Sequence, residues 1–288
     1  MLLSLFVMKL KQKLGLSYIR TKFKLLSFVS KRQTATAAFK LFCTPILKSP
    51  DRNPAIFVSA EVVNFSLNGL NVQGYRWNKE KDHKILILHG FGSAAHNFYS
   101  YITVMVDKGY QVLAFDAPAH GNSEGKTINA MEYSQMIEKV IELYGPMNGF
   151  LAHSFGGIAL SLTLEKKSHN EDTKIVFIAP ATETTTAIDS AFEMLRIKDK
   201  SVRAAFDKII FDRGGKPTEW YSIKRAMTNI TASILWIHDE EDDITPLKDA
   251  LKVKEEGFPN IEFVITKGLG HRKIYRDITV QNKIAAFL

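Results

Sequence analysis

Ser154 lies at a position where a serine hydroxyl could act as a nucleophile. An apolar stretch ends just before it, and a run suited to a helix, Ile158 to Leu164, follows it directly. Ala152 and Gly156, two positions either side, are small enough for a sharp turn from strand to helix, and such a turn exposes the central side chain. Because a serine hydroxyl is a poor nucleophile without a neighbouring base, this interpretation requires a histidine.

His271 is the best candidate for that base. It follows the apolar run 261–265 on the glycine-rich segment 268–270, which we expect to be flexible enough to bring the imidazole to Ser154. An acidic cluster, 239–243, follows another apolar run, 234–238. A carboxylate from that cluster would orient the imidazole and stabilise its protonated form. Asp239, Asp242 and Asp243 are all candidates on position alone.

The elements that must position these residues alternate between strand and helix from residue 54 onward. Runs 61–67 and 72–77, separated by Asn68-Gly69, predict a hairpin. Further predicted strands cover 84–88, 111–115, 149–153, 174–179, 234–238 and 261–265, and predicted helices cover 94–108, 130–144 and 156–167. This alternation predicts an α/β fold, with a mainly parallel sheet, helices on both faces and an antiparallel hairpin at the N-terminal edge. Residues 181–232 read as helix only, including a predicted helix over 199–212.

Four motifs in order resemble those of the α/β-hydrolase superfamily, from about Ala60 to the C-terminus. They are the segments 89–92 (His-Gly-Phe-Gly), 115–123, 153–157 (His-Ser-Phe-Gly-Gly) and 270–271 (Gly-His). The resemblance implies a triad of Ser154, Asp242 and His271, with Asp242 preferred because it lies three residues before Thr245-Pro246. It further implies an oxyanion hole formed by the backbone amides of Phe91 and Phe155. It also implies that residues 181–232 form a small helical cap inserted after the sixth strand.

The function that this resemblance implies is hydrolysis of a carboxylic ester or thioester through an acyl-enzyme. The same triad could serve a membrane-associated lipase, an acyltransferase or a C–C bond hydrolase, and the scaffold could also belong to a non-catalytic binding protein. A serine at position 154, where dehalogenases and epoxide hydrolases have a carboxylate, argues against those activities. No cysteine–histidine spacing typical of zinc sites and no glycine-rich phosphate loop occurs, so we expect no metal and no other cofactor.

Positive charge is concentrated at the N-terminus. Residues 1–50 contain ten Lys/Arg and no Asp or Glu, which leaves 28 basic against 30 acidic residues in the rest of the chain. The body therefore lacks the charge pattern of a nucleic-acid-binding protein. We divide the chain into a basic extension, 1–53, and a hydrolase domain, 54–288. The sequence carries no signal for oligomeric state.

The extension has helical periodicity over residues 9–32. A basic face lies beside an apolar stripe, which suits peripheral contact with an anionic membrane. The basic residues are Lys9, Lys13, Arg20, Lys24 and Lys31, and the apolar ones are Leu10, Leu14, Tyr18, Leu25 and Phe28. The single cysteine, Cys43, is consistent with a reducing compartment. We expect a cytoplasmic protein that acts on a small molecule and can contact the inner face of the membrane.

Overall fold

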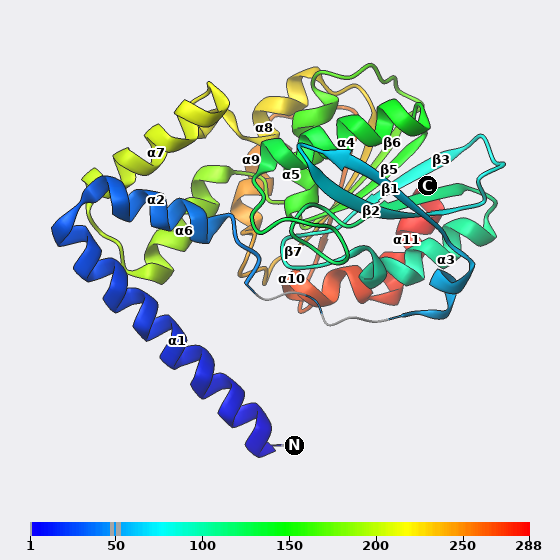
Figure 1. The fold of residues 1–288 in the computed structure, drawn as a ribbon. Helices are drawn as coiled ribbons and strands as arrows, with labels where there is room; N and C mark the ends of the chain where they lie inside the picture. The colour runs from blue at the N-terminus through cyan, green and yellow to red at the C-terminus, as the bar shows by residue number, and fades with distance from the viewer. Residues whose placement is uncertain (1, 47–48, 50–52) are drawn as a thin grey trace. The chain divides into compact units, whose positions relative to one another are not determined.

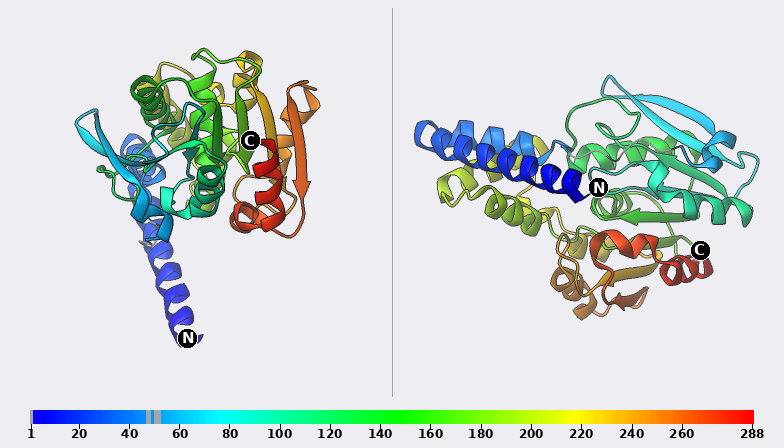
Figure 2. Two further views of the ribbon diagram at one scale, coloured as in Figure 1. Left: turned by 90° about the vertical axis from the view of Figure 1, so that its right-hand side faces the viewer. Right: turned by 90° about the horizontal axis from the view of Figure 1, so that it is seen from below.

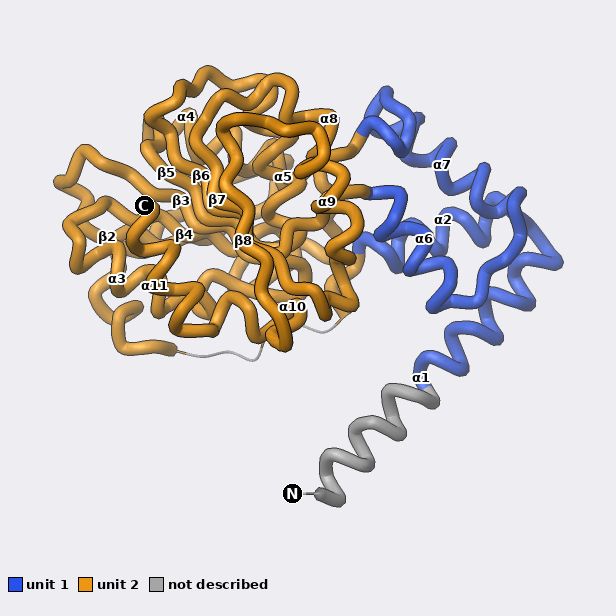
Figure 3. The backbone as a smooth tube through the Cα atoms, turned by 180° about the vertical axis from the view of Figure 1, so that it is seen from behind, with its two compact units in different colours: residues 1–43, 184–220 blue, residues 44–183, 221–288 orange. Residues whose placement is uncertain are grey.

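The structure is a computed structural model that describes residues 2–46, 49 and 53–288, with the backbone alone for residues 2–14. It contains two compact units. The smaller comprises residues 1–43 and 184–220, and the larger comprises residues 44–183 and 221–288 (Figure 3). Each unit has its own hydrophobic core and is described separately.

The larger unit is built on an eight-stranded sheet with the order β1-β2-β4-β3-β5-β6-β7-β8. The first two strands pair antiparallel with each other, and β2 pairs antiparallel with β4, whereas all the other pairs are parallel. The β1–β2 hairpin and β8 lie at opposite edges (Figure 2). The strands are β1 Glu61–Leu67, β2 Leu70–Trp77, β3 Lys84–Leu88, β4 Gln111–Phe115, β5 Gly149–His153, β6 Lys174–Ile178, β7 Ser233–Asp239 and β8 Ile261–Thr266. The predicted fold class is confirmed.

Side-chain patterns account for this sheet. The central strands β4 and β5 are buried along their whole length, as expected for parallel strands covered on both faces. The edge strand β1 instead alternates between exposed and half-buried residues. Asn68 and Gly69, with φ of 52° and 79°, form the two-residue turn between β1 and β2. Asn-Gly is favoured there because both positions need a left-handed backbone.

Helices cover both faces of this sheet (Figure 1). On one face, α3 and α11 pack with side chains from the sheet such as Ile87, Leu151 and Ile237. On the other face, α4 and α5 pack against each other. The helices of this unit are α3 Tyr99–Asp107, α4 Ala130–Tyr144, α5 Phe155–Leu164, α8 Ile223–Ala226, α9 Leu247–Glu255, α10 Gly270–Lys273 and α11 Ile278–Phe287.

The smaller unit joins the N-terminal segment to the helices inserted after β6. Its helices are α1 Leu2–Val29, α2 Lys31–Phe42, α6 Thr184–Leu195 and α7 Lys200–Gly214, followed by a 3-10 turn, Thr218–Trp220. Phe23 of α1 and Ala35 of α2 share one core with Phe192 of α6 and Phe206 of α7. The unit boundaries therefore differ from the predicted division into 1–53 and 54–288, because Phe23 of α1 and Ala35 of α2 are buried against α6 and α7 of the predicted cap.

The structure has two helices where the sequence predicted one over 9–32. The first, α1, ends at Val29, and Ser30 caps α2 by accepting a hydrogen bond from the Gln33 amide. Tyr18, Leu25 and Phe28 of the predicted apolar stripe are 71, 63 and 76% exposed, whereas the side chains of its other two members lie outside the described residues. Within the described residues, no helix has both the length and the apolar content needed to cross a bilayer.

Candidate active site

Ser154 lies at a strained turn between β5 and α5. Its φ of 53° and ψ of −117° place a non-glycine residue in a region that is costly without support. The support includes a hydrogen bond from its amide to the Ile178 carbonyl, 3.1 Å long. Gly156 is required because a Cβ there would lie 2.9 Å from the carbonyl oxygens of both Leu88 and His89. The turn therefore holds the hydroxyl beyond the end of β5, as the motif predicts.

His271 lies in the first turn of the short helix α10. The structure has this helix where a glycine-rich loop was expected, and Asp239 at the end of β7 hydrogen-bonds to its first residues. One Asp239 oxygen accepts from the Gly270 amide at 2.8 Å, and the other accepts from the Leu269 amide at 3.1 Å. Among the described residues, Asp239 makes no hydrogen bond with the imidazole itself, so it supports the backbone that carries His271.

Asp242 is the carboxylate that reaches the imidazole. Its Oδ2 lies 2.8 Å from Nδ1 of His271, and its Oδ1 accepts from the amides of Ile244 and Thr245. Burial alone would raise the pKa of Asp242, but these hydrogen bonds and the adjacent imidazole outweigh it and lower the pKa. Asp243, the third candidate, is exposed.

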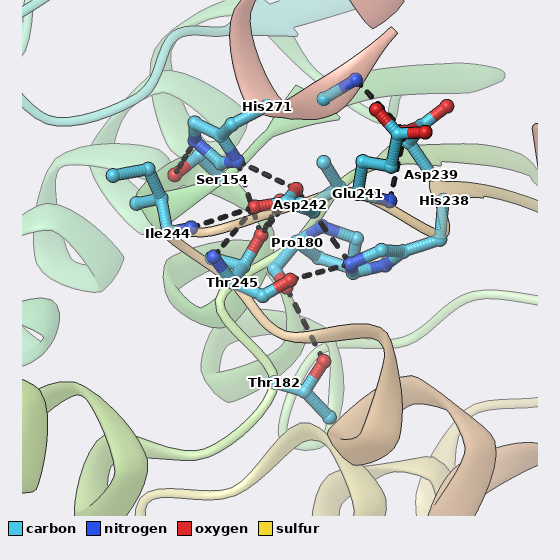
Figure 4. A network of polar contacts seen from close by, with 12 residues as sticks. Ser154, Pro180, Thr182, His238, Asp239, Glu241, Asp242, Ile244, Thr245 and His271 are labelled. Carbon is cyan, nitrogen blue, oxygen red and sulfur yellow. Dashed lines mark hydrogen bonds and ion pairs between the residues drawn. The ribbon is translucent and has the colours of Figure 1, made fainter. Parts of the chain in front are cut away.

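The structure brings Ser154, His271 and Asp242 into one hydrogen-bonded chain (Figure 4). Nε2 of His271 lies 3.0 Å from Oγ of Ser154, on the opposite side of the ring from Asp242. With the Nδ1 proton donated to the carboxylate, Nε2 is free to accept the serine proton. All three residues are buried, with exposed fractions of 7 to 8%, so their interactions are only weakly screened by water.

Thr245 adds a contact that sequence reasoning did not find. Its hydroxyl lies 2.9 Å from Oδ2 of Asp242 and 3.1 Å from both Nδ1 of His271 and the Ala179 carbonyl. On the far side, Nε2 of His238 donates to the Thr245 carbonyl at 2.6 Å. Burial lowers the pKa of His238 and keeps it neutral. The sequence analysis used Thr245 only to choose Asp242 by its spacing. In the structure, the Thr245 hydroxyl contacts both the Asp242 carboxylate and the His271 imidazole.

His153 packs against His271 on the buried side of the turn. Its Nε2 donates to the His271 carbonyl at 3.2 Å, and the two ring centroids lie 4.8 Å apart. Burial lowers the pKa of His153 to about 3, so the ring is neutral at physiological pH. Its Nδ1 is buried with no hydrogen-bond partner among the described residues. Its proximity to the proposed base could not be read from its place beside Ser154 in the sequence.

The amides of Phe91 and Phe155 make no hydrogen bond within the described part of the chain. Phe155 is the first residue of α5, where backbone N–H groups point outward from the helix end and carry partial positive charge. Gly90 brings the Phe91 loop close to the turn, because a Cβ at Gly90 would lie 3.0 Å from that of Ser154. Neither amide therefore has a hydrogen-bond acceptor among the described residues.

Two histidines hold the loops around these amides. Nε2 of His120 accepts from the Gly92 amide at 2.8 Å, and Nε2 of His89 accepts from the Ala117 amide at 3.0 Å. Burial lowers the pKa of His89 to about 4, which keeps its Nε2 free to accept. Asp116 likewise accepts from the amides of Ala95 and Asn122 and so joins two of these loops.

The apolar side chains of Phe91, Phe155 and Ile244 come from the segments that carry the site, and we refer to them as the apolar wall. The rings of Phe91 and Phe155 meet edge-on with centroids 5.5 Å apart, and Phe91 remains 41% exposed. Ile244, beside Asp242, is 52% exposed. In the part of the chain that the structure describes, no group of three or more His, Cys, Asp or Glu side chains is arranged to hold a metal ion.

Known proteins are similar to parts of this chain. Residues 79–214 match the family model Hydrolase_4, described as serine aminopeptidase, S33. The chain is 24% identical to the uncharacterized protein YqkD of Bacillus subtilis over 202 residues. This aligned region covers 66% of each of the two chains. It spans between 39 and 66% of the length of the curated relatives it matches.

Solved structures share the fold. An esterase from Pyrococcus furiosus superposes with a TM-score of 0.64 and 16% identity, over 85% of this chain and 97% of that one. A bacterial membrane phospholipase A superposes with a TM-score of 0.58 and 16% identity, over 99% of this chain and 96% of that one. At these identities the likeness concerns the fold alone.

Proposed function

We propose that this chain is a serine hydrolase of the α/β-hydrolase superfamily that cleaves a carboxylic ester or thioester through an acyl-enzyme. The observation that carries the proposal is the hydrogen-bonded chain from Ser154 Oγ through His271 to Asp242. A binding protein on the same scaffold would not need these three groups aligned, buried and adjacent to two unpaired amides.

The proposed reaction has two halves. In the first, Oγ of Ser154 attacks the acyl carbonyl while Nε2 of His271 takes its proton, and the amides of Phe91 and Phe155 hold the developing oxyanion. The imidazolium then gives that proton to the departing alcohol or thiol. In the second half, water attacks the acyl-enzyme with the same base, which releases the acid. Each oxyanion donor contributes on the order of 10²–10³-fold to the rate.

An apolar acyl group fits the wall beside Ser154. Phe91 and Ile244 are exposed apolar side chains next to a buried polar site, and they would lose water on contact with an aliphatic chain. Each methylene that is buried contributes about 0.8 kcal/mol. We therefore expect kcat/KM for p-nitrophenyl esters to rise with acyl length over the first few carbons.

A fluorophosphonate probe tests the activated serine directly. The wild type is expected to label, whereas Ser154→Ala and His271→Ala should neither label nor hydrolyse p-nitrophenyl esters. Thermal unfolding must show that both variants keep the wild-type fold. Full activity in either folded variant would refute the assignment, and failure of the folded wild type to label would favour the binding-protein interpretation.

A second candidate function uses the same triad at a membrane, as a lipase, an acyltransferase or a C–C bond hydrolase. It is favoured by the exposed side chains of Tyr18, Leu25 and Phe28, on a segment without acidic residues. Deleting α1 would remove Phe23 from the core of its unit, so surface substitutions are the better test. We expect Leu25→Ser/Phe28→Ser to reduce co-sedimentation with vesicles. Undiminished binding would exclude this face as the contact.

A further inference from the structure

A basic pocket of about 480 Å³ lies in the smaller unit, between α1 and the segment that joins α6 to α7. Four cationic side chains line it: Arg20, Lys24, Arg196 and Lys198. Nε of Arg20 donates to the Met194 carbonyl at 2.8 Å, which holds the guanidinium against the end of α6. Its terminal nitrogens make no hydrogen bond to any described residue.

The acidic side chain in this pocket is already neutralised. Asp199 pairs with Lys31 at 2.5 Å and accepts from the Ser201 amide as the cap of α7. Lys24, Arg196 and Lys198 form no ion pair within the described part of the chain. The pocket therefore gathers four positive charges without internal compensation, which favours an anionic ligand.

Arg196 occupies a backbone position that is usually glycine. The Ile197 amide bonds to the Phe192 carbonyl and the Arg196 amide to the Glu193 carbonyl, which is the hydrogen-bond pattern of a Schellman motif at the end of α6. Arg196 is the left-handed residue of this motif, with φ of 57°. An arginine that accepts this strain, where glycine would avoid it, points to a role for its side chain outside the fold.

The exposed apolar face of α1 adjoins this pocket. Thr21 and Lys24 line the pocket, and Leu25 and Phe28 follow each of them by four residues, so they lie on neighbouring positions of the helix surface. Leu25 and Phe28 are exposed, as is Val29 at 78%. A cationic pocket beside an apolar stripe matches the two layers of a bilayer surface, the phosphates and the acyl chains beneath them.

We propose that this pocket binds the phosphate group of a phospholipid at an anionic bilayer surface, while the stripe of Tyr18, Leu25, Phe28 and Val29 enters the acyl layer. Arginine offers paired donors to phosphate oxygens, and the lysines add point charges. This proposal rests on the membrane contact proposed above and gives it a specific headgroup site. It does not depend on the hydrolytic reaction.

Co-sedimentation of the full chain with phosphatidylcholine vesicles, with and without 30% phosphatidylglycerol, tests the site. Lys24→Gln/Lys198→Gln removes two charges from the pocket. Lys81→Gln/Lys254→Gln removes two exposed charges from the larger unit and serves as the matched control. Because each basic residue at an anionic surface changes binding about fivefold, we expect the pocket variant to lose about 25-fold and the control less than twofold. Equal losses would mean that net charge alone drives binding, and would overturn the pocket.

Arg196→Gly separates ligand binding from stability. Glycine adopts the left-handed conformation without strain, so the melting temperature should stay level or rise while vesicle binding falls about fivefold. Unchanged vesicle binding, or a lower melting temperature, would overturn the role assigned to Arg196.

A competition arm identifies the source of the phosphate. Inorganic phosphate at 10 mM, matched for ionic strength with chloride, should displace the wild type from vesicles and should have less effect on the pocket variant. Stabilisation of the protein by phosphate, without vesicle binding, would overturn a lipid ligand. Ser154→Ala should bind vesicles as the wild type does, so failure of the headgroup site and failure of the proposed hydrolase can be told apart.

Discussion

Replacing Asp242 by Asn tests which of three neighbouring acids serves His271. In the structure, Oδ1 of Asp242 accepts two backbone amides, and Oδ2 lies 2.8 Å from Nδ1 of His271. The asparagine oxygen can keep both amide donors, which leaves its NH₂ group facing Nδ1. His271 must then present an unprotonated Nδ1, so its proton moves to Nε2, 3.0 Å from Oγ of Ser154. In that tautomer the ring cannot accept the serine proton.

The expected cost follows from this tautomer. When the triad imidazole carries its proton on Nε2 and not on Nδ1, kcat falls on the order of 10⁴-fold. This corresponds to about 5.4 kcal/mol in activation free energy. The assay is hydrolysis of a p-nitrophenyl ester across pH 5–9, with thermal unfolding to show that the variant folds.

Asp239→Asn and Asp243→Asn are isosteric controls within the same cluster. Asp239 holds the amides of Leu269 and Gly270, so its loss should displace His271 slightly and cost at most about a hundredfold. Asp243 is exposed and should have no effect on the rate. If folded Asp239→Asn loses as much activity as Asp242→Asn, the tautomer argument is refuted and the acid has been wrongly assigned.

Two further predictions concern stability. Gly156→Ala should destabilise the fold by about 1–3 kcal/mol, because its Cβ would meet two backbone oxygens at 2.9 Å; denaturant melts would show this, and an unaltered midpoint would contradict the close approach. Acid should also destabilise the protein, since burial lowers the pKa of His89 to about 4 and of His153 to about 3. Between these values and about 6.5 the unfolded chain binds more protons than the folded chain does. The contribution of each histidine to the free energy of unfolding is therefore fully present above pH 6.5 and is lost as the pH falls, by about 2 kcal/mol between pH 7 and pH 5. Equal free energies of unfolding at pH 7 and pH 5 would show that these rings are not buried and neutral.

The order of elements in the larger unit could be predicted because its signals are local. Continuous apolar runs mark the buried strands, Asn68-Gly69 marks the hairpin turn, and the small residues around Ser154 mark the elbow. These patterns follow from backbone geometry over a few residues. The positions of Ser154 and His271 at the ends of their strands follow from the same alternation.

The order of residues left three acids open, and only the resemblance favoured Asp242, because the choice depends on which carboxylate faces a ring 29 residues later in the chain. The same holds for Thr245 and His153, whose contacts with His271 exist only after β5, β7 and α10 are brought together. It also holds for the N-terminal helices. Their basic and apolar residues are visible in the sequence, but their membership of one core with α6 and α7 is a packing result.

Hydrophobic periodicity and turn chemistry act over short spans, so the strands, their order and the residue types at the ends of the parallel strands can be predicted from the sequence. Two features arise only on folding: Asp242 faces the imidazole while Asp239 holds its backbone, and Arg20 and Lys24 share a pocket with Arg196 and Lys198. These groups meet through packing between segments remote in the chain, and local sequence carries no record of that packing.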